Sequence, residues 1–297
     1  MALAETRIIL GCMRIANLDI AAVRELIDAS LAAGVNFFDH ADIYGGGRCE
    51  ELFGTVLASQ PGLREKIIIQ TKCGIRRGFY DFSKEHILRS VDQSLQRLRT
   101  DYVDVLLLHR PDTLMEPDEV AEAFTALEES GKVRCFGVSN HSPLQIELLQ
   151  RWLPQRIRFN QLQFSAAHTG MIDAGLNVNM KIDPAVDRDG GILEYCRLRE
   201  ITIQAWSPLQ FGFFDGVFLG HPDYADLNRV LERIGEEQGV SAAAVAVAWI
   251  LRHPAKMQVV VGTTKPNHLQ EICAAERVNL TREQWYEIYR AAGNKLP

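Results

Sequence analysis

The segment Val103-Asp-Val-Leu-Leu-Leu-His109 contains the most hydrophobic run of the chain and ends in a histidine. Its apolar residues follow one another instead of alternating with polar ones, which is typical of a strand buried on both faces. Strands of this kind form parallel sheets that helices cover. The segment therefore predicts an α/β protein in which a polar side chain emerges at the carboxyl end of a buried strand.

The same alternation of a short apolar run and a helical pattern continues along the chain. Strands are expected at residues 8–10, 35–38, 67–69, 103–108, 133–138, 158–162, 201–205 and 258–261. No tight hairpin joins these runs, so we expect parallel pairing. Eight strands with intervening helices favour a (β/α)8 TIM barrel. An open doubly wound sheet fits the same alternation, but the G-x-G-x-x-G turn with which such sheets bind dinucleotides is missing.

The connections add further expectations about the architecture. Residues 166–191 and 210–224 are expected to be long loops after strands six and seven. Ser142 with Gln145, and Thr281 with Gln284, form capping-box patterns, and the second begins a C-terminal helix. No linker-like segment divides the 297 residues, so we expect a single domain over residues 1–297.

Composition excludes several classes of protein. The chain has 32 basic and 38 acidic side chains and a net charge of −6, so it has no electrostatic footprint for nucleic acid. We expect no membrane span, because no run of about 20 apolar residues occurs, and the N-terminus lacks a signal-peptide pattern. The six cysteines are scattered without a C-x-x-C pair, which favours a reducing compartment and a cytoplasmic location.

Four polar side chains near the predicted strand ends suggest acid–base chemistry: Asp39, Tyr44, Lys72 and His109. Each alone has an ordinary structural explanation, but a barrel would gather all four at one mouth. A tyrosine with a pKa of about 10 is a weak acid, and burial would weaken it further. We therefore expect the Lys72 cation to lower the pKa of Tyr44, Asp39 to orient Lys72, and neutral His109 to donate a hydrogen bond. Tyr44 would then protonate a carbonyl oxygen.

Several motifs resemble the aldo-keto reductase superfamily, and in particular a bacterial branch of predicted oxidoreductases. The matching segments are Phe38-Asp-His-Ala-Asp-Ile-Tyr-Gly45, Gln70-Thr-Lys72, Leu107-Leu-His-Arg-Pro-Asp112, Gly137-Val-Ser-Asn140, Asn160-Gln161, Trp206-Ser-Pro-Leu209 and Gly262-Thr-Thr-Lys265. The resemblance implies a barrel enzyme that uses NADP(H) to reduce aldehydes or ketones to alcohols, with NAD(H) left open as the cofactor. It also implies a catalytic tetrad of Asp39, Tyr44, Lys72 and His109, and no metal.

The resemblance further implies where the cofactor binds. Ser139, Asn140 and Gln161 match positions that bind the nicotinamide carboxamide, and Trp206 matches a ring that stacks on the nicotinamide. Ser207 and Leu209 match the pyrophosphate segment. The remaining positions match the adenosine end and comprise Gly262, Thr263, Thr264, Lys265, His268 and Glu271. Because the chain is acidic and the cofactor is a polyanion, we expect Lys265, with Lys72 deeper in the mouth, to supply local positive charge.

Two departures from the family pattern affect the expected cofactor preference. His268 stands where the family usually has arginine, and Ile272 where it usually has asparagine. A neutral histidine lacks the charge of arginine, so we expect NADPH preference to strengthen as the pH falls toward about 6.

Two other functions are compatible with the sequence. One is that of a cofactor-binding redox-sensing or regulatory subunit with little turnover, and the other is that of a metal-dependent barrel hydrolase. Phe211, Phe213, Phe214 and Phe218 could either line a substrate pocket or pack together within their loop.

Overall fold

The computed structural model describes residues 7–296, in which eight parallel strands close into a barrel. The strands are β1 (Ile8–Gly11), β2 (Phe37–Asp39), β3 (Ile68–Cys73), β6 (Val105–Leu108), β7 (Phe136–Ser139), β8 (Ile157–Gln163), β9 (Thr202–Trp206) and β10 (Gln258–Val261). Each pairs with its sequence neighbour in the barrel, and β1 pairs with both β2 and β10 to close it. The expected barrel is confirmed, and every predicted strand overlaps an observed one.

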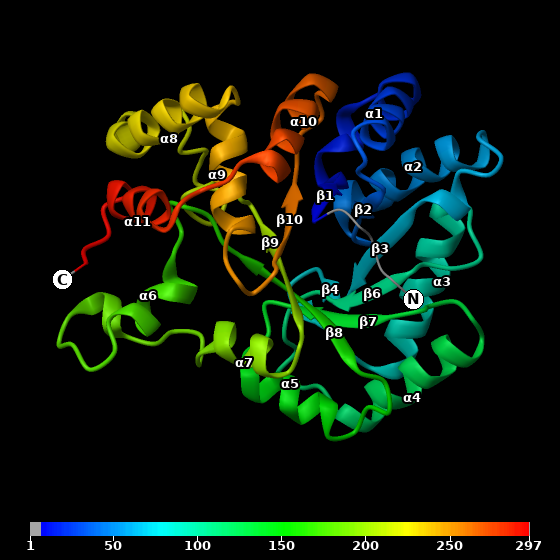
Figure 1. Cartoon of the computed structure of the whole chain (residues 1–297). Helices are drawn as coiled ribbons and strands as arrows, with labels where there is room; N and C mark the ends of the chain where they lie inside the picture. Colours follow the sequence, from blue (N-terminus) through cyan, green and yellow to red (C-terminus); the bar gives the residue numbers. More distant parts are fainter. Residues whose placement is uncertain (1–6, 297) are drawn as a thin grey trace.

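Helices surround the strands (Figure 1). They are α1 (Ile20–Ala32), α2 (Arg48–Ala58), α3 (Lys84–Leu98), α4 (Pro117–Glu129), α5 (Pro143–Gln150), α6 (Gly170–Leu176), α7 (Ile192–Leu198), α8 (Ala225–Gln238), α9 (Ala242–Leu251), α10 (Pro266–Cys273) and α11 (Arg282–Ala291). Both predicted capping boxes are present, at Ser142 before α5 and at Thr281 before α11.

The connections hold more regular structure than the sequence patterns indicated. Residues 166–191, expected as a loop, contain α6 and a 3-10 turn at Asp183–Ala185. Residues 210–224 contain a short antiparallel bridge between Gln210 and Val217. A small hairpin of β4 (Ile75–Arg76) and β5 (Phe79–Tyr80) also follows β3. These elements are too short for a clear hydrophobic period, which explains why they were not predicted.

The inside of the barrel contains both apolar and polar side chains. One apolar cluster consists of Ile9, Phe37, Ile68, Val105, Leu107, Phe159 and Val260. Because side chains alternate along a strand, the next inward positions of β3 are Gln70 and then Lys72. Gln70 belongs to a buried chain of amides in which Gln204 accepts from Gln70 and donates to Gln258. Polar side chains therefore lie among the apolar ones inside the barrel, and the inward positions of β3 become polar toward its carboxyl end.

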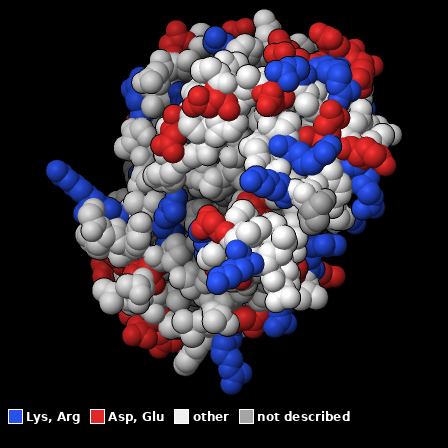
Figure 2. Space-filling model, turned by 90° about the vertical axis from the view of Figure 1, so that its left-hand side faces the viewer, with Lys and Arg blue, Asp and Glu red and all other residues white. Residues whose placement is uncertain are grey.

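The outer surface carries mixed charge. On the face shown in Figure 2, basic and acidic side chains are interspersed, in keeping with the small net charge. Within residues 7–296, none of the helices combines the length and the apolar character needed to cross a membrane.

Candidate active site

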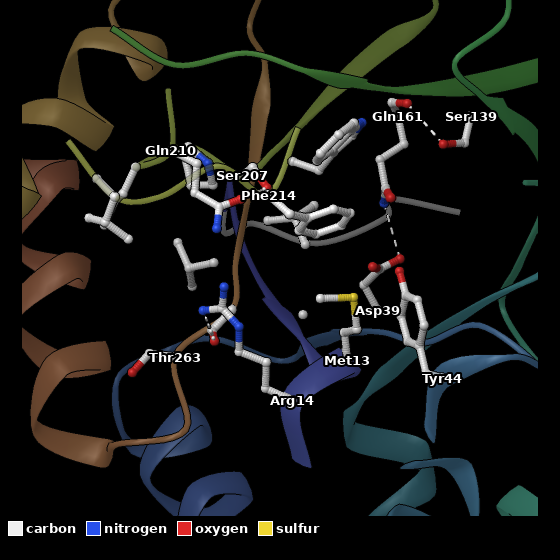
Figure 3. A pocket seen from close by; sticks show the side chains of 18 of the residues that line it. Met13, Arg14, Asp39, Tyr44, Ser139, Gln161, Ser207, Gln210, Phe214 and Thr263 are labelled. Carbon is white, nitrogen blue, oxygen red and sulfur yellow. Dashed lines mark hydrogen bonds between the residues drawn. The ribbon is translucent and has the colours of Figure 1, made fainter. Parts of the chain in front are cut away.

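A cavity of about 850 Å³ opens at the carboxyl ends of the barrel strands. Residues at or just after the ends of β1, β2, β6, β7, β8, β9 and β10 line it. In Figure 3, Asp39 and Tyr44 lie at one end of this cavity, and Arg14 and Thr263 lie toward the other. A site of this kind takes its side chains from many strands, which is the usual position of an active site in a (β/α)8 barrel.

Three of the four predicted catalytic side chains, Asp39, Lys72 and Tyr44, are connected by hydrogen bonds. The Lys72 ammonium donates to Asp39 Oδ2 at 2.7 Å, to the Tyr44 hydroxyl at 3.0 Å and to the His40 carbonyl at 2.8 Å. The fourth, His109, lies edge-on to Tyr44 with 6.0 Å between ring centres. Asp39, Tyr44 and His109 line the cavity, whereas Lys72 is fully buried behind them.

The charges of this cluster set its protonation. Burial lowers the pKa of Lys72, but Asp39 and Tyr44 more than offset this, so the net pKa lies above the ordinary value. Burial lowers the pKa of His109 well below its ordinary value, and Lys72 and Arg110 lower it further. His109 is therefore neutral at neutral pH, as expected, and its buried Nδ1 has no hydrogen-bond partner among the described residues.

The expected lowering of the Tyr44 pKa is wrong for this structure. Burial raises the pKa of Tyr44 more than the Lys72 ammonium lowers it, so the net pKa is raised. Burial and the cation act on this pKa in opposite directions, and their balance cannot be predicted from the sequence because the degree of burial depends on the fold. Tyr44 is thus a protonated phenol at neutral pH, which is the form that can donate a proton.

Two amide side chains donate hydrogen bonds to Asp39. Asp39 Oδ1 accepts from Gln70 Nε2 at 2.5 Å and from Gln161 Nε2 at 3.1 Å. The Gln161 side chain also donates to Gln204, and the Gln161 backbone carbonyl accepts a hydrogen bond from the Ser139 hydroxyl. Figure 3 shows the hydrogen bonds of Gln161 with Ser139 and with Asp39. Gln161, expected only as a cofactor ligand, therefore also positions Asp39.

Residues beside the tetrad face the helices instead of the cavity. His40 is buried with its ring 4.7 Å from that of Phe53 in α2, so it points away from the barrel interior. Asp42 is largely buried near Glu50. Burial, and after it the charge of Glu50, raises the pKa of Asp42 to about 7.

Within residues 7–296, no group of three or more His, Cys, Asp or Glu side chains is arranged to hold a metal ion.

An indole ring and two polar residues line the next part of the cavity. Trp206 Nε1 donates to Asn140 Oδ1 at 3.1 Å, and Asn140 Nδ2 donates to the Ser139 hydroxyl at 2.8 Å. Asn140 adopts a left-handed φ of 58°, and its side chain contacts Trp206 of β9. These bonds fix the orientation of the Trp206 ring at the cavity wall.

Six of the twelve predicted cofactor residues belong to the rest of the cavity wall. Ser207, Leu209, Gly262, Thr263, His268 and Glu271 all line it. Thr264 and Lys265 are not among the lining residues, and Lys265 is exposed at the start of α10. Of the two lysines expected to supply positive charge, Lys72 is buried in an ion pair and Lys265 stays a prediction, whereas Arg14 and Arg110 are the arginines that line the cavity.

Sequence reasoning missed several lining residues. Arg14 follows β1 and donates to the Gly262 carbonyl at 3.2 Å, which bridges the ends of β1 and β10. Its position directly after a strand was the available signal. Other lining residues that were not singled out are Met13, Ile43, Ile75 and Arg110.

The phenylalanines of the loop after β9 divide between the two expected roles. Phe213 and Phe214 line the cavity, and each ring centre lies 6.1 Å from that of Trp206. Phe211 packs on Tyr224 instead, and Phe218 is fully buried. The loop thus contributes an aromatic wall beside Trp206.

Comparisons with known proteins agree with this architecture. The Aldo/keto reductase family model matches residues 7–292. An uncharacterized oxidoreductase, YcsN, of Bacillus subtilis is 41% identical over 98% of this chain and 96% of that protein. A 6-dehydroglucose reductase of Agrobacterium fabrum is 40% identical over 98% of this chain and 95% of that protein. The chain therefore belongs to the aldo/keto reductase family and is an oxidoreductase.

A solved structure has the same fold. The aldo-keto reductase of Klebsiella pneumoniae, crystallised in complex with NADPH, superposes with a TM-score of 0.76 at 24% sequence identity, covering 96% of this chain and 90% of that one. At this identity, the likeness concerns the barrel and not the residues of the site.

Proposed function

We propose that this protein reduces aldehydes or ketones to alcohols with NADP(H) as the hydride donor. The proposal rests on the hydrogen bonds that connect Asp39 to Lys72 and Lys72 to Tyr44. The Tyr44 hydroxyl lies at the cavity wall beside the neutral His109. A phenol that is protonated, within 3.0 Å of an ammonium and next to an apolar cavity is equipped to donate a proton.

The chain's own residues perform the acid–base part of the reaction. Tyr44 would donate its proton to the carbonyl oxygen as that oxygen gains negative charge. The Lys72 ammonium would stabilise the phenolate left behind, and Asp39 holds Lys72 in place. His109, being neutral, can donate a hydrogen bond to the same oxygen without competing for the proton. The nicotinamide, when bound, supplies the hydride.

The cavity fits such a cofactor in shape and chemistry. It extends from the tetrad past the fixed indole of Trp206 to polar and basic groups at the other end. A flat ring could lie against Trp206, with Ser139 and Asn140 beside it. At the opposite end, Arg14 and His268 could face phosphate groups, with Thr263 and Glu271 near the adenosine.

Replacing the proposed acid tests this function directly. Tyr44→Phe should lower kcat for carbonyl reduction by about 100-fold or more, since general acid catalysis contributes about 10²–10⁴-fold. NADPH binding, followed by quenching of tryptophan fluorescence, should persist in the variant. Tyr80→Phe is the matched control, because Tyr80 is exposed in the β4–β5 hairpin and does not line the cavity. An unchanged kcat in Tyr44→Phe would reject the proposed acid.

The proposed setting is a cytoplasmic enzyme acting on a small carbonyl compound. All six cysteines are unpaired, which favours a reducing compartment.

A further inference from the structure

One cation at the catalytic end of the cavity has no part in the chemistry proposed above. Among the described residues that line the cavity, the charged side chains are Arg14, Asp39, Arg110 and Glu271. Asp39 is bound to Lys72, and Arg14 is bound to the carbonyl of Gly262 (Figure 3 shows it away from Tyr44). Arg110 remains, and it follows His109 directly in the chain.

Arg110 is partly buried and lacks an anionic partner. Within residues 7–296 it forms no ion pair or side-chain hydrogen bond, and its guanidinium carbon lies 5.3 Å from the ring centre of Phe213. Other partly buried arginines differ: Arg64 and Arg97 each contact a buried carboxylate at 2.8 Å. A guanidinium that faces a cavity without a carboxylate retains unused donors and uncompensated charge.

The surroundings of Arg110 favour an anion as its ligand. Apolar side chains line the cavity together with Arg110, among them Ile43, Ile75 and the adjacent Phe213. Such surroundings strengthen the attraction between opposite charges compared with water. The charge of Arg110 also reaches the catalytic group beside it, because it helps to lower the pKa of His109 after burial and Lys72. A group bound to Arg110 would therefore lie close to the reacting carbonyl.

We propose that Arg110 binds an anionic group carried by the carbonyl substrate, which makes oxyanion-bearing aldehydes or ketones, such as carboxylates, the preferred substrates. The inference rests on the carbonyl reductase function proposed above. The planar fork of arginine suits a carboxylate, because it can donate two parallel hydrogen bonds. Phe213 would hold the guanidinium in place from the other side.

The test compares two aldehydes that differ in charge, para-carboxybenzaldehyde and its methyl ester. The measured quantity is the ratio of kcat/KM for the acid to kcat/KM for the ester, with NADPH as cofactor. The wild-type protein should favour the acid. Arg110→Gln should lower the ratio about 10- to 100-fold, mainly through KM of the acid, as expected for losing a hydrogen bond between charged groups. Arg110→Lys should lie between the two, since a point charge replaces the fork.

The control variant is Arg151→Gln, which removes an exposed arginine just after α5, outside the cavity. It should keep the wild-type ratio. Higher salt should lower the ratio in the wild type more than in Arg110→Gln. A wild-type preference for the ester, or an unchanged ratio in Arg110→Gln, would overturn the role of Arg110. Failure of the wild type to reduce either aldehyde would instead overturn the reductase function, and with it this inference.

Discussion

At the scale of single residues, the buried charge of Lys72 organises the site. The side chain is completely buried, a position that would favour the neutral amine without partners. Asp39 at 2.7 Å and the His40 carbonyl at 2.8 Å keep it charged. Its third donor points at Tyr44, so the cation is held where a phenolate would form. The hydrogen bond from Lys72 therefore favours the phenolate, although burial outweighs this effect on the pKa of Tyr44.

The raised pKa of Tyr44 makes opposite predictions for the two directions of the reaction. Reduction needs the phenol, which is the stable form below its raised pKa, so kcat/KM for a carbonyl should be flat from about pH 6 to 9. Alcohol oxidation needs the phenolate as a base, so its kcat/KM should rise by nearly tenfold per pH unit over about the same range. Profiles measured in both directions provide the check. An oxidation rate independent of pH would contradict Tyr44 as the titrating group.

At the scale of elements, close contact between helices determines where α2 can lie. Gly54, inside α2, is buried against the end of α3, and a Cβ at this position would lie 2.2 Å from the Arg97 carbonyl oxygen. The Glu50 carboxylate, one turn earlier in α2, accepts hydrogen bonds from Arg97 of α3 and from Thr71 of β3. These contacts fix α2, and with it the preceding turn that carries Tyr44.

Gly54→Ala should therefore destabilise the protein. Alanine favours the helix by about 1 kcal/mol over glycine, but overpacking costs about 1–3 kcal/mol, and the backbone of α3 cannot yield as a side chain could. We expect a lower free energy of unfolding, measured with urea. Gly175→Ala in α6 is the control, because its Cβ would meet only Glu194 at an ordinary 3.6 Å. A Gly54 variant as stable as the wild type would show that α2 and α3 can move apart.

At the scale of the whole molecule, closure of the barrel places basic groups where an acidic protein can bind a polyanion. The net charge is −6, and charges of both signs mix on the face shown in Figure 2. Arg14 comes from the segment after β1 and His268 from α10, yet both line one end of the cavity. The fold, and not any basic run in the sequence, thus brings Arg14 and His268 to the same cavity.

This arrangement predicts a preference between the two cofactors. NADPH should bind more tightly than NADH, because Arg14 and His268 line the end of the cavity where its additional phosphate would lie. Dissociation constants for both cofactors, measured by tryptophan fluorescence, provide the check. His268→Gln should reduce the preference for NADPH. Equal affinities of the wild-type protein for the two cofactors would contradict the prediction.

The fold and the cluster of Asp39, Tyr44, Lys72 and His109 could be predicted from the sequence because their signals are local. Buried strands such as β6 appear as continuous apolar runs, and capping boxes such as the one at Ser142 need only four residues. The motifs around Tyr44 and His109 are likewise contiguous segments. Local interactions of this kind do not depend on which segments later become neighbours.

Only the tertiary structure decided the balance of charge and burial at the site. It showed that burial outweighs Lys72 at Tyr44, that Gln161 also supports Asp39, and that Lys265 lies outside the cavity. It also brought Arg14 to Gly262 across 248 positions of sequence. Sequence order determined the eight strands and the polar residues that follow them, whereas pKa values and ligand contacts depend on distances through space, which exist only once the barrel has closed.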